Sequence, residues 1–362
     1  MSSTTVPLLH LSSPGPRTSV PRPASHQRAE LAQQAPTSVG APDPPLAVDR
    51  SPLPARHRLA GSCLVRSRPM SSATVREAHT WRSTPIAGLI RAHPVAAFFV
   101  LAYLFSWVYW LVVLGIMGRD TLAWLVPGAF GPPLAALLVT GLIDGRDGTR
   151  AFLRRWVLWR VRARWYVLVL VGLPALGLLV GLLFRDWSER FAGSGPSVIV
   201  TYLATLSFLL VLGGGQEEPG WRGFALPRMQ ERMGPLAASV SLGVLWGLWH
   251  LPVFVFVPGY NSAGRGVASI AASVLVFTAV GAVGQSLLLT WLFNHTRGSV
   301  LIAVLAHASL NAGSGFVTGQ TASMAVLASF GIVGLGLVFA TRGRLSFRPV
   351  TTPSARLSTP RH

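Results

Sequence analysis

Long apolar runs alternate with short polar segments between residues 94 and 340. Each run is close to the roughly 20 residues that a helix needs to cross the hydrocarbon core of a bilayer. The pattern predicts an all-α fold, a polytopic membrane helix bundle with about eight transmembrane helices. We place these helices at residues 94–117, 124–143, 166–184, 197–215, 236–257, 267–293, 299–316 and 322–340.

The first 92 residues have a different character. They are rich in Ser, Pro, Ala and Arg and show no sustained helical or strand period, which is typical of disorder. The apolar stretch 6–11 is too short for a secretory signal, and Met70 offers a second start, so we expect residues 1–69 to be an extension of the reading frame. The chain then divides into a disordered cytoplasmic region (1–92), a transmembrane domain (93–340) and a basic cytoplasmic tail (341–362).

Composition narrows the class of protein. The chain is 51% hydrophobic and only 12% charged, whereas soluble domains carry about a quarter charged residues. The composition therefore argues against a soluble globular enzyme. The single cysteine, Cys63, excludes a disulfide within the chain and a cluster of cysteine metal ligands. The net charge of +19 leaves a nucleic-acid-binding protein and a membrane protein with basic loops in competition.

The distribution of arginine decides between these two classes. All 31 basic residues are arginine, and an N-terminus on the inside places 27 of them inside and 4 outside. When residues 1–92 are omitted, 16 arginines remain inside and 4 outside, so the bias persists. Basic residues accumulate on the cytoplasmic side of membrane proteins. We therefore expect a multi-pass protein of the cell membrane with both termini in the cytoplasm.

Residues 146–164 hold seven arginines interleaved with aromatic and aliphatic residues, including Trp156 and Trp159. This pattern indicates an interfacial helix, with tryptophans at the depth of the lipid headgroups and arginines on anionic lipid. A nucleic-acid-binding stripe is the rival interpretation. The position between two membrane spans favours lipid, and we expect no nucleic-acid partner.

Few ionisable groups interrupt the apolar segments, where each costs about 2.5–3.5 kcal/mol. Glu217 and Glu218 follow an apolar run in GGGQEEPGWRGF, and His250 lies in LWGLWHLPVFVF. His307 and Asn311 lie in LAHASLNA. The candidate chemistry of the chain is therefore concentrated in these residues.

The two adjacent glutamates are expected to have different roles, one structural and one chemical. Arg222 follows Glu218 by four residues, so on a continuous helix the two form an ion pair. Glu217 then has no charged partner nearby in the sequence, and a free carboxylate in apolar surroundings suits a general base. Pro219 disfavours helical backbone at Glu218 unless the helix begins or kinks there.

Each polar residue on the later spans has two interpretations. His250, flanked by Trp246, Trp249 and Phe254, is either a core histidine bonded to a carbonyl or a functional group. His307 and Asn311 share a helix face, where they either donate hydrogen bonds to an oxyanion or join two helices.

Taken together, Glu-Glu-x-x-x-Arg, Trp-x-x-x-His and His-x-x-x-Asn, in this order on successive membrane helices, resemble the CPBP family of intramembrane proteases, also called the CAAX protease and bacteriocin-processing (Abi) family. AFGPPLAALLVT (129–140) and TWLFNHTRGSVL (290–301) look similar too, so the resemblance covers about residues 124–315. Trp246 stands where the family often has Phe, which looks conservative. The matching residues are Glu217, Glu218, Arg222, Trp246, His250, His307 and Asn311.

The resemblance implies an intramembrane endopeptidase that cleaves a membrane-associated protein or peptide. Glu217 and His250 would activate a water, and His307 and Asn311 would stabilise the oxyanion. The site would be supported by Glu218, Arg222 and Trp246.

Members of the family are often labelled metalloproteases, and Glu217, His250 and His307 could supply three zinc ligands. The chain has no HExxH arrangement, and no acidic residue follows the histidines to orient a ligating imidazole. We therefore favour direct activation of water, and expect no cofactor unless it is one divalent metal ion such as zinc.

Two other classes of function remain. Some relatives are non-catalytic, with roles in bacteriocin self-immunity or as scaffolds. A transporter ranks lowest, because two inverted halves with broken helices are not evident.

The predicted spans also leave a problem of depth. At 1.5 Å per residue, His250 lies about 21 Å and His307 about 12 Å from the cytoplasmic boundary, with Glu217 near the surface. The three converge only if the fourth span continues past Phe224, or if the fifth and seventh begin earlier or tilt. We also expect a water-filled cavity open to the cytoplasmic side.

Overall fold

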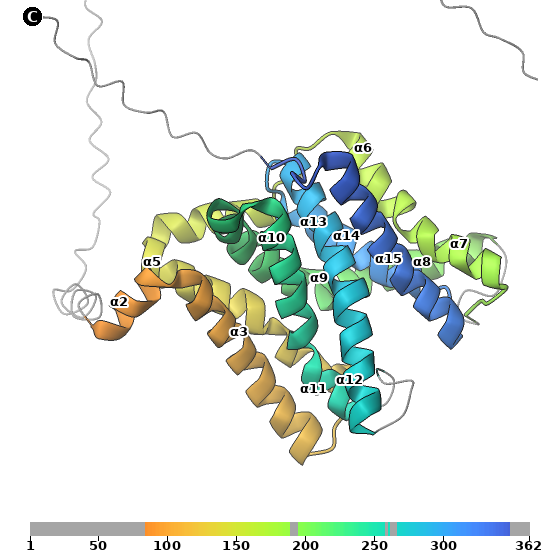
Figure 1. The fold of residues 1–362 in the computed structure, drawn as a ribbon, viewed down its shortest axis with the longest axis horizontal. Coiled ribbons are helices and arrows are strands. Elements are labelled where there is room, and N and C mark those ends of the chain that lie inside the picture. The colour runs from red at the N-terminus through yellow and green to blue at the C-terminus, as the bar shows by residue number, and fades with distance from the viewer. Residues whose placement is uncertain (1–83, 189–194, 258–259, 261–265, 348–362) are drawn as a thin grey trace, which may run out of the picture. The chain divides into compact units, whose positions relative to one another are not determined.

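The computed structural model describes residues 84–188, 195–257, 260 and 266–347. All of them belong to one compact unit, Pro69–His362. Every regular element within these ranges is a helix (Figure 1). Six helical stretches are long and apolar enough to cross a membrane, and the shorter apolar helix Val300–Ser314 accompanies them. The predicted all-α membrane bundle is confirmed.

All eight predicted spans are helical. The first comprises α3 (Pro94–Trp110) and η1 (Leu111–Ile116), and a short connection through α4 (Leu122–Leu125) and η2 (Pro127–Phe130) leads to the second, α5 (Gly131–Trp156). The third comprises α6 (Ala163–Val167), η3 (Leu168–Gly172) and α7 (Pro174–Phe184), and the fourth is α8 (Gly195–Leu212). The others are the end of α10 (Leu226–Trp249) with α11 (Leu251–Phe256); α12 (Val267–Val276), η7 (Phe277–Ala282) and α13 (Val283–His295); α14 (Val300–Ser314); and α15 (Gln320–Thr341).

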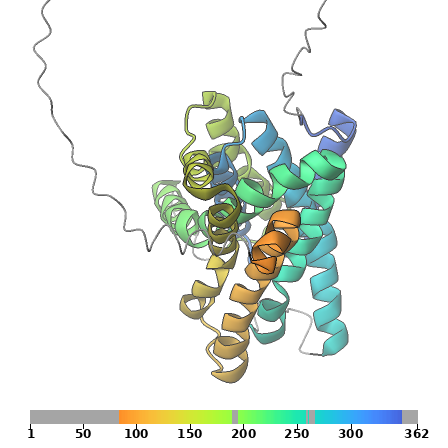
Figure 2. The same cartoon turned by 90° about the vertical axis from the view of Figure 1, so that its left-hand side faces the viewer.

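Helix α2 (Pro85–Ala92) lies inside the region predicted to be disordered. It forms because Thr84 caps its first turn, accepting the Ala87 N–H at 3.2 Å, and because Pro85 occupies the first helical position. Ala87 is buried. The prediction of disorder is therefore wrong for residues 84–92, while residues 1–83, with Met70, lie outside the described part. Figure 2 views the molecule from the side on which α2 lies.

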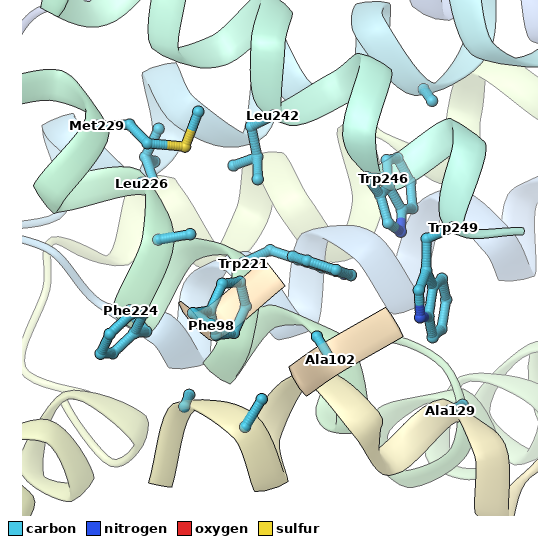
Figure 3. Packing of buried hydrophobic residues seen from close by; sticks show 14 of the residues in the cluster. Phe98, Ala102, Ala129, Trp221, Phe224, Leu226, Met229, Leu242, Trp246 and Trp249 are labelled. Atoms are coloured by element: carbon cyan, nitrogen blue, oxygen red, sulfur yellow. The ribbon is translucent and has the colours of Figure 1, made fainter. Parts of the chain in front are cut away.

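A buried helix replaces the cytoplasmic loop predicted after the fourth span. The backbone breaks at Gly213 and then forms α9 (Gly214–Glu218), η5 (Pro219–Ala225) and the first part of α10. The next break is Gly234, whose φ of 77° lies in a region that glycine adopts without strain. Every residue from 216 to 226 is buried, as expected for a helix enclosed on all sides. The apolar cluster around this segment is shown in Figure 3.

This arrangement changes the count of loop arginines. Arg222, assigned from sequence to an inside loop, is fully buried. Within the described residues, side chains join four stretches from segments predicted to be inside, at residues 144–160, 228–230, 294–299 and 345. The contacts are Arg228–Asp144 at 2.9 Å, Asn294–Gln230 at 2.8 Å, Asn294–Leu345 at 3.0 Å, Ser299–Leu158 at 2.6 Å and Arg297–Arg160. We call this side of the molecule the arginine-rich side.

The predicted interfacial helix is shorter than residues 146–164. Gly145 breaks α5 with a φ of 66°, so residues 146–156 form a separate helical segment, and 158–162 are not helical. All seven arginines of the range are exposed, and so are Leu153, Val157 and Trp159. Exposed apolar and cationic residues therefore follow one another along this segment.

Candidate active site

Glu218 is the centre of a buried charge network. One of its oxygens, Oε1, accepts from Nη1 of Arg222 at 3.0 Å and from Nδ1 of His307 at 2.8 Å. The side chains of Glu218 and Arg222 are fully buried, and that of His307 is 3% exposed. The predicted Glu218–Arg222 pair is confirmed, and the histidine from α14 is an additional partner.

The wide turn of η5 explains how this pair forms beside Pro219. Glu218 ends α9, Pro219 begins the π-helical segment, and Arg222 reaches back to Glu218 from one turn later. Proline is tolerated at the first position of a helical segment because its missing N–H has no partner there in any case.

Glu217 accepts two indole N–H groups on one oxygen. Nε1 of Trp246 lies 2.5 Å from its Oε2, and Nε1 of Trp221 lies 3.4 Å from the same atom. Glu217 is 7% exposed, whereas Trp221 and Trp246 are 0% and 2% exposed. The sequence interpretation missed Trp221, although its position four residues after Glu217 places it on the same helix face.

His250 is held in one tautomer. Its Nδ1 lies 2.9 Å from the carbonyl oxygen of Trp246, and a carbonyl only accepts, so Nδ1 carries the proton. Nε2 of the neutral ring then has a free lone pair. The bond to a carbonyl and a functional role are therefore compatible, although the sequence presented them as alternatives.

Trp246 brings the two histidines together. Its ring lies edge-on to His250 and His307, with centroid distances of 5.6 and 5.3 Å. Asn311 is half-buried one turn after His307 on α14, and its side chain forms no hydrogen bond within the described residues. Six of the seven motif residues therefore lie in one connected cluster, and Asn311 adjoins it along the helix.

Glycines allow the neighbouring elements to approach this cluster. A Cβ at Gly220 would lie 2.6 Å from Cβ of Pro132, and one at Gly214 would lie 2.7 Å from the carbonyl oxygen of Val304 and 3.0 Å from Cβ of His307. Such distances are too short for carbon, so only glycine fits without displacement. The stretch 129–140, which looked similar to the family, thus packs directly on the segment that carries the two glutamates.

The fourth span ends at Gly213 and does not continue past Phe224 as one helix. The chain nevertheless stays buried after this break, in α9, η5 and the start of α10, so Glu217 lies within the bundle. A pocket of about 290 Å³ lies between α5 and α10 on the arginine-rich side, with Asp144, Arg155 and Glu231 in its wall and none of the motif residues. The expected water-filled cavity at Glu217 stays a prediction.

The two histidines of the cluster are oriented as metal-ligating histidines commonly are, but the side chains around them are not arranged as a metal site. Nδ1 of His250 is held by a carbonyl and Nδ1 of His307 by Glu218, which is the way ligating histidines are commonly oriented. The carboxylate that the sequence seemed to lack is thus supplied from upstream by Glu218. Among the described residues, however, no three His, Cys, Asp or Glu side chains are placed to hold a metal ion.

Comparison with known proteins supports the resemblance that the motif residues suggested. Residues 197–313 match the sequence model of the type II CAAX prenyl endopeptidase Rce1-like family. CAAX prenyl protease 2 of Methanococcus maripaludis is 26% identical over 191 residues, which are 52% of this chain and 69% of the relative. The matched region contains α9, η5, α10 and most of α14, and so all seven motif residues. The comparisons therefore support the assignment of this chain to the CAAX protease (CPBP) family and a protease activity, and its apolar helices indicate a multi-pass membrane protein.

Proposed function

We propose that this chain cleaves a membrane-associated protein or peptide with a water activated by Glu217 and His250. The observation that carries the proposal is the placement of Glu217. It is the slightly exposed member of the glutamate pair, and Trp246 joins it to both histidines, whereas Glu218 is fully buried and already paired. One carboxylate is thus available for chemistry, and the other is structural.

The proposed reaction uses groups at named atoms. Glu217 takes a proton from the water, and the hydroxide oxygen bonds to the scissile carbonyl carbon while the carbonyl oxygen gains the negative charge. His250 orients the water through the lone pair of Nε2. When the tetrahedral intermediate collapses, the C–N bond breaks and the proton on Glu217 passes to the departing amine nitrogen.

His307 and Asn311 would donate hydrogen bonds to the oxyanion. Because Nδ1 of His307 donates to Glu218, its Nε2 donates only when the ring carries both protons. The 2.8 Å contact between Nδ1 of His307 and Glu218 fixes the orientation of the ring. Glu218 would therefore orient His307 as well as hold Arg222.

The test compares the termini of membrane proteins from cells that express the wild type or Glu217→Gln. New termini should appear with the wild type and be lost in Glu217→Gln, at equal amounts of folded protein. Glu231→Gln is a matched control, because Glu231 is an acid outside the motif cluster. Identical termini from wild type and Glu217→Gln would refute the mechanism.

Zinc remains the alternative for the activation step, with Glu217, His250 and His307 as its ligands. Activity that persists in a strong chelator supports direct activation. Activity that is lost in the chelator and restored by zinc supports the metal site.

A non-catalytic role within the same family is the second candidate function. The double variant Glu217→Gln/His250→Ala separates it from proteolysis. If this variant fully complements a deletion phenotype, the role of the protein in the cell does not require peptide-bond hydrolysis.

The arginine-rich side is proposed to face the cytoplasm and anionic lipid. Support comes from the predicted inside segments that join there and from the seven exposed arginines of residues 146–164 beside exposed Val157 and Trp159. Vesicles with increasing phosphatidylglycerol should stabilise the wild type more than the variant Arg154→Ala/Arg155→Ala. Equal stabilisation would refute the lipid contact.

A further inference from the structure

Trp246 contacts four other members of the motif cluster. It donates to Oε2 of Glu217 at 2.5 Å and lies edge-on to His250 and His307. The guanidinium carbon of Arg222 lies 5.5 Å from the centroid of its ring. The exchange of Phe for Trp at this position is therefore not conservative, because Phe has a similar ring but no N–H to donate.

The two oxygens of Glu217 have different surroundings. Oε2 accepts hydrogen bonds from the indoles of Trp246 and Trp221. Figure 3 shows these two indoles on separate helical segments. Oε1 accepts no hydrogen bond from the described residues. Bonds from an N–H to a charged carboxylate are among the stronger ones in proteins, so the two indoles restrict rotation of the carboxylate.

We infer that Trp246, assisted by Trp221, is a positioning residue that assigns separate tasks to the oxygens of Glu217. Oε2 is the anchored atom, and Oε1 is the atom that takes the proton from water. This inference rests on the proposed function, in which Glu217 is the base. A carboxylate held in one orientation keeps its free oxygen directed at the water, and small errors in such placement are costly in rate.

The kinetic test uses the full chain in proteoliposomes with a substrate identified from the comparison of termini. Trp246→Phe should lower kcat by about tenfold to a hundredfold and leave KM within about twofold, because the lost bond acts on the base rather than on substrate binding. Trp221→Phe should have a smaller effect, since its bond is longer.

Trp249→Phe is the matched control. Trp249 lies on the same helix, is 1% exposed and is also edge-on to His250, at 4.8 Å. Its Nε1 has no hydrogen-bond partner among the described residues. The control thus removes the same atoms beside His250 without removing a bond to Glu217, and kcat should stay within about threefold of the wild type.

A spectroscopic test does not depend on the folding of the Trp246 variant. In chains labelled with ¹⁵N-tryptophan, Glu217→Gln should shift the indole N–H resonance of Trp246 and leave that of Trp249 in place. An unshifted Trp246 resonance, or equal kcat for Trp246→Phe and Trp249→Phe while Glu217→Gln is inactive, overturns this inference alone. An active Glu217→Gln overturns the proposed function itself.

Discussion

The substitution Arg222→Met tests the buried charge network most directly. It removes the guanidinium from Glu218 and leaves an aliphatic chain of similar length. Both side chains of the pair are 0% exposed, and the charged atoms lie 3.0 Å apart. Removing one partner of a fully buried pair costs about 3–5 kcal/mol, because the remaining charge stays buried without compensation. We expect a loss of this size in the free energy of unfolding.

The measurement is reversible unfolding of the purified chain in mixed detergent micelles, followed by tryptophan fluorescence. The double variant Glu218→Gln/Arg222→Met should be more stable than Arg222→Met, since it has no buried uncompensated charge and its amide oxygen still accepts from Nδ1 of His307. It also serves as the test if the single variant fails to fold. Arg150→Met is the control, because its contact with Asp147 joins side chains that are 72% and 97% exposed, and no measurable change is expected. A loss below about 1 kcal/mol for Arg222→Met, or equal losses for the single and double variants, would refute this account.

Two further predictions concern packing and orientation. Gly220→Ala should destabilise the fold by about 1–3 kcal/mol and reduce activity, because its Cβ would lie 2.6 Å from Pro132, whereas Gly88→Ala, with nothing within 4 Å, should have little effect in the same unfolding assay. In intact cells, a membrane-impermeant maleimide should label Arg119→Cys and not Arg150→Cys, each in a cysteine-free background, if the arginine-rich side is cytoplasmic; the reverse pattern would contradict the proposed orientation.

Local regularities of the sequence predicted much of the helical fold. The eight apolar runs are visible because a membrane span needs a fixed length of uncharged residues, and all eight are helical. The pair Glu218–Arg222 followed from the four-residue spacing. The same spacing could have revealed Trp221 as a partner of Glu217, since Trp221 also follows its glutamate by four residues.

The sequence was misleading where a segment rich in polar residues is buried in the fold. The segment 216–233 contains glutamates, arginines and two prolines, so the sequence predicts a loop there, although residues 216–226 are all buried. Neighbouring helices supply the partners that make this burial possible, and hydropathy does not record them.

Sequence alone thus determined the helices, the motif residues and the pairing within one helical turn, because these depend on spacing along a single helix. Only the tertiary structure decided that Trp246 bonds Glu217 and that Glu218 orients His307, across 29 and 89 residues of chain. Contacts of this range depend on how separate helices pack, and spacing in the sequence carries no record of it. The sequence thus predicted that the two glutamates differ, and the packed bundle decided which distant side chains they contact, Trp246 for Glu217 and His307 for Glu218.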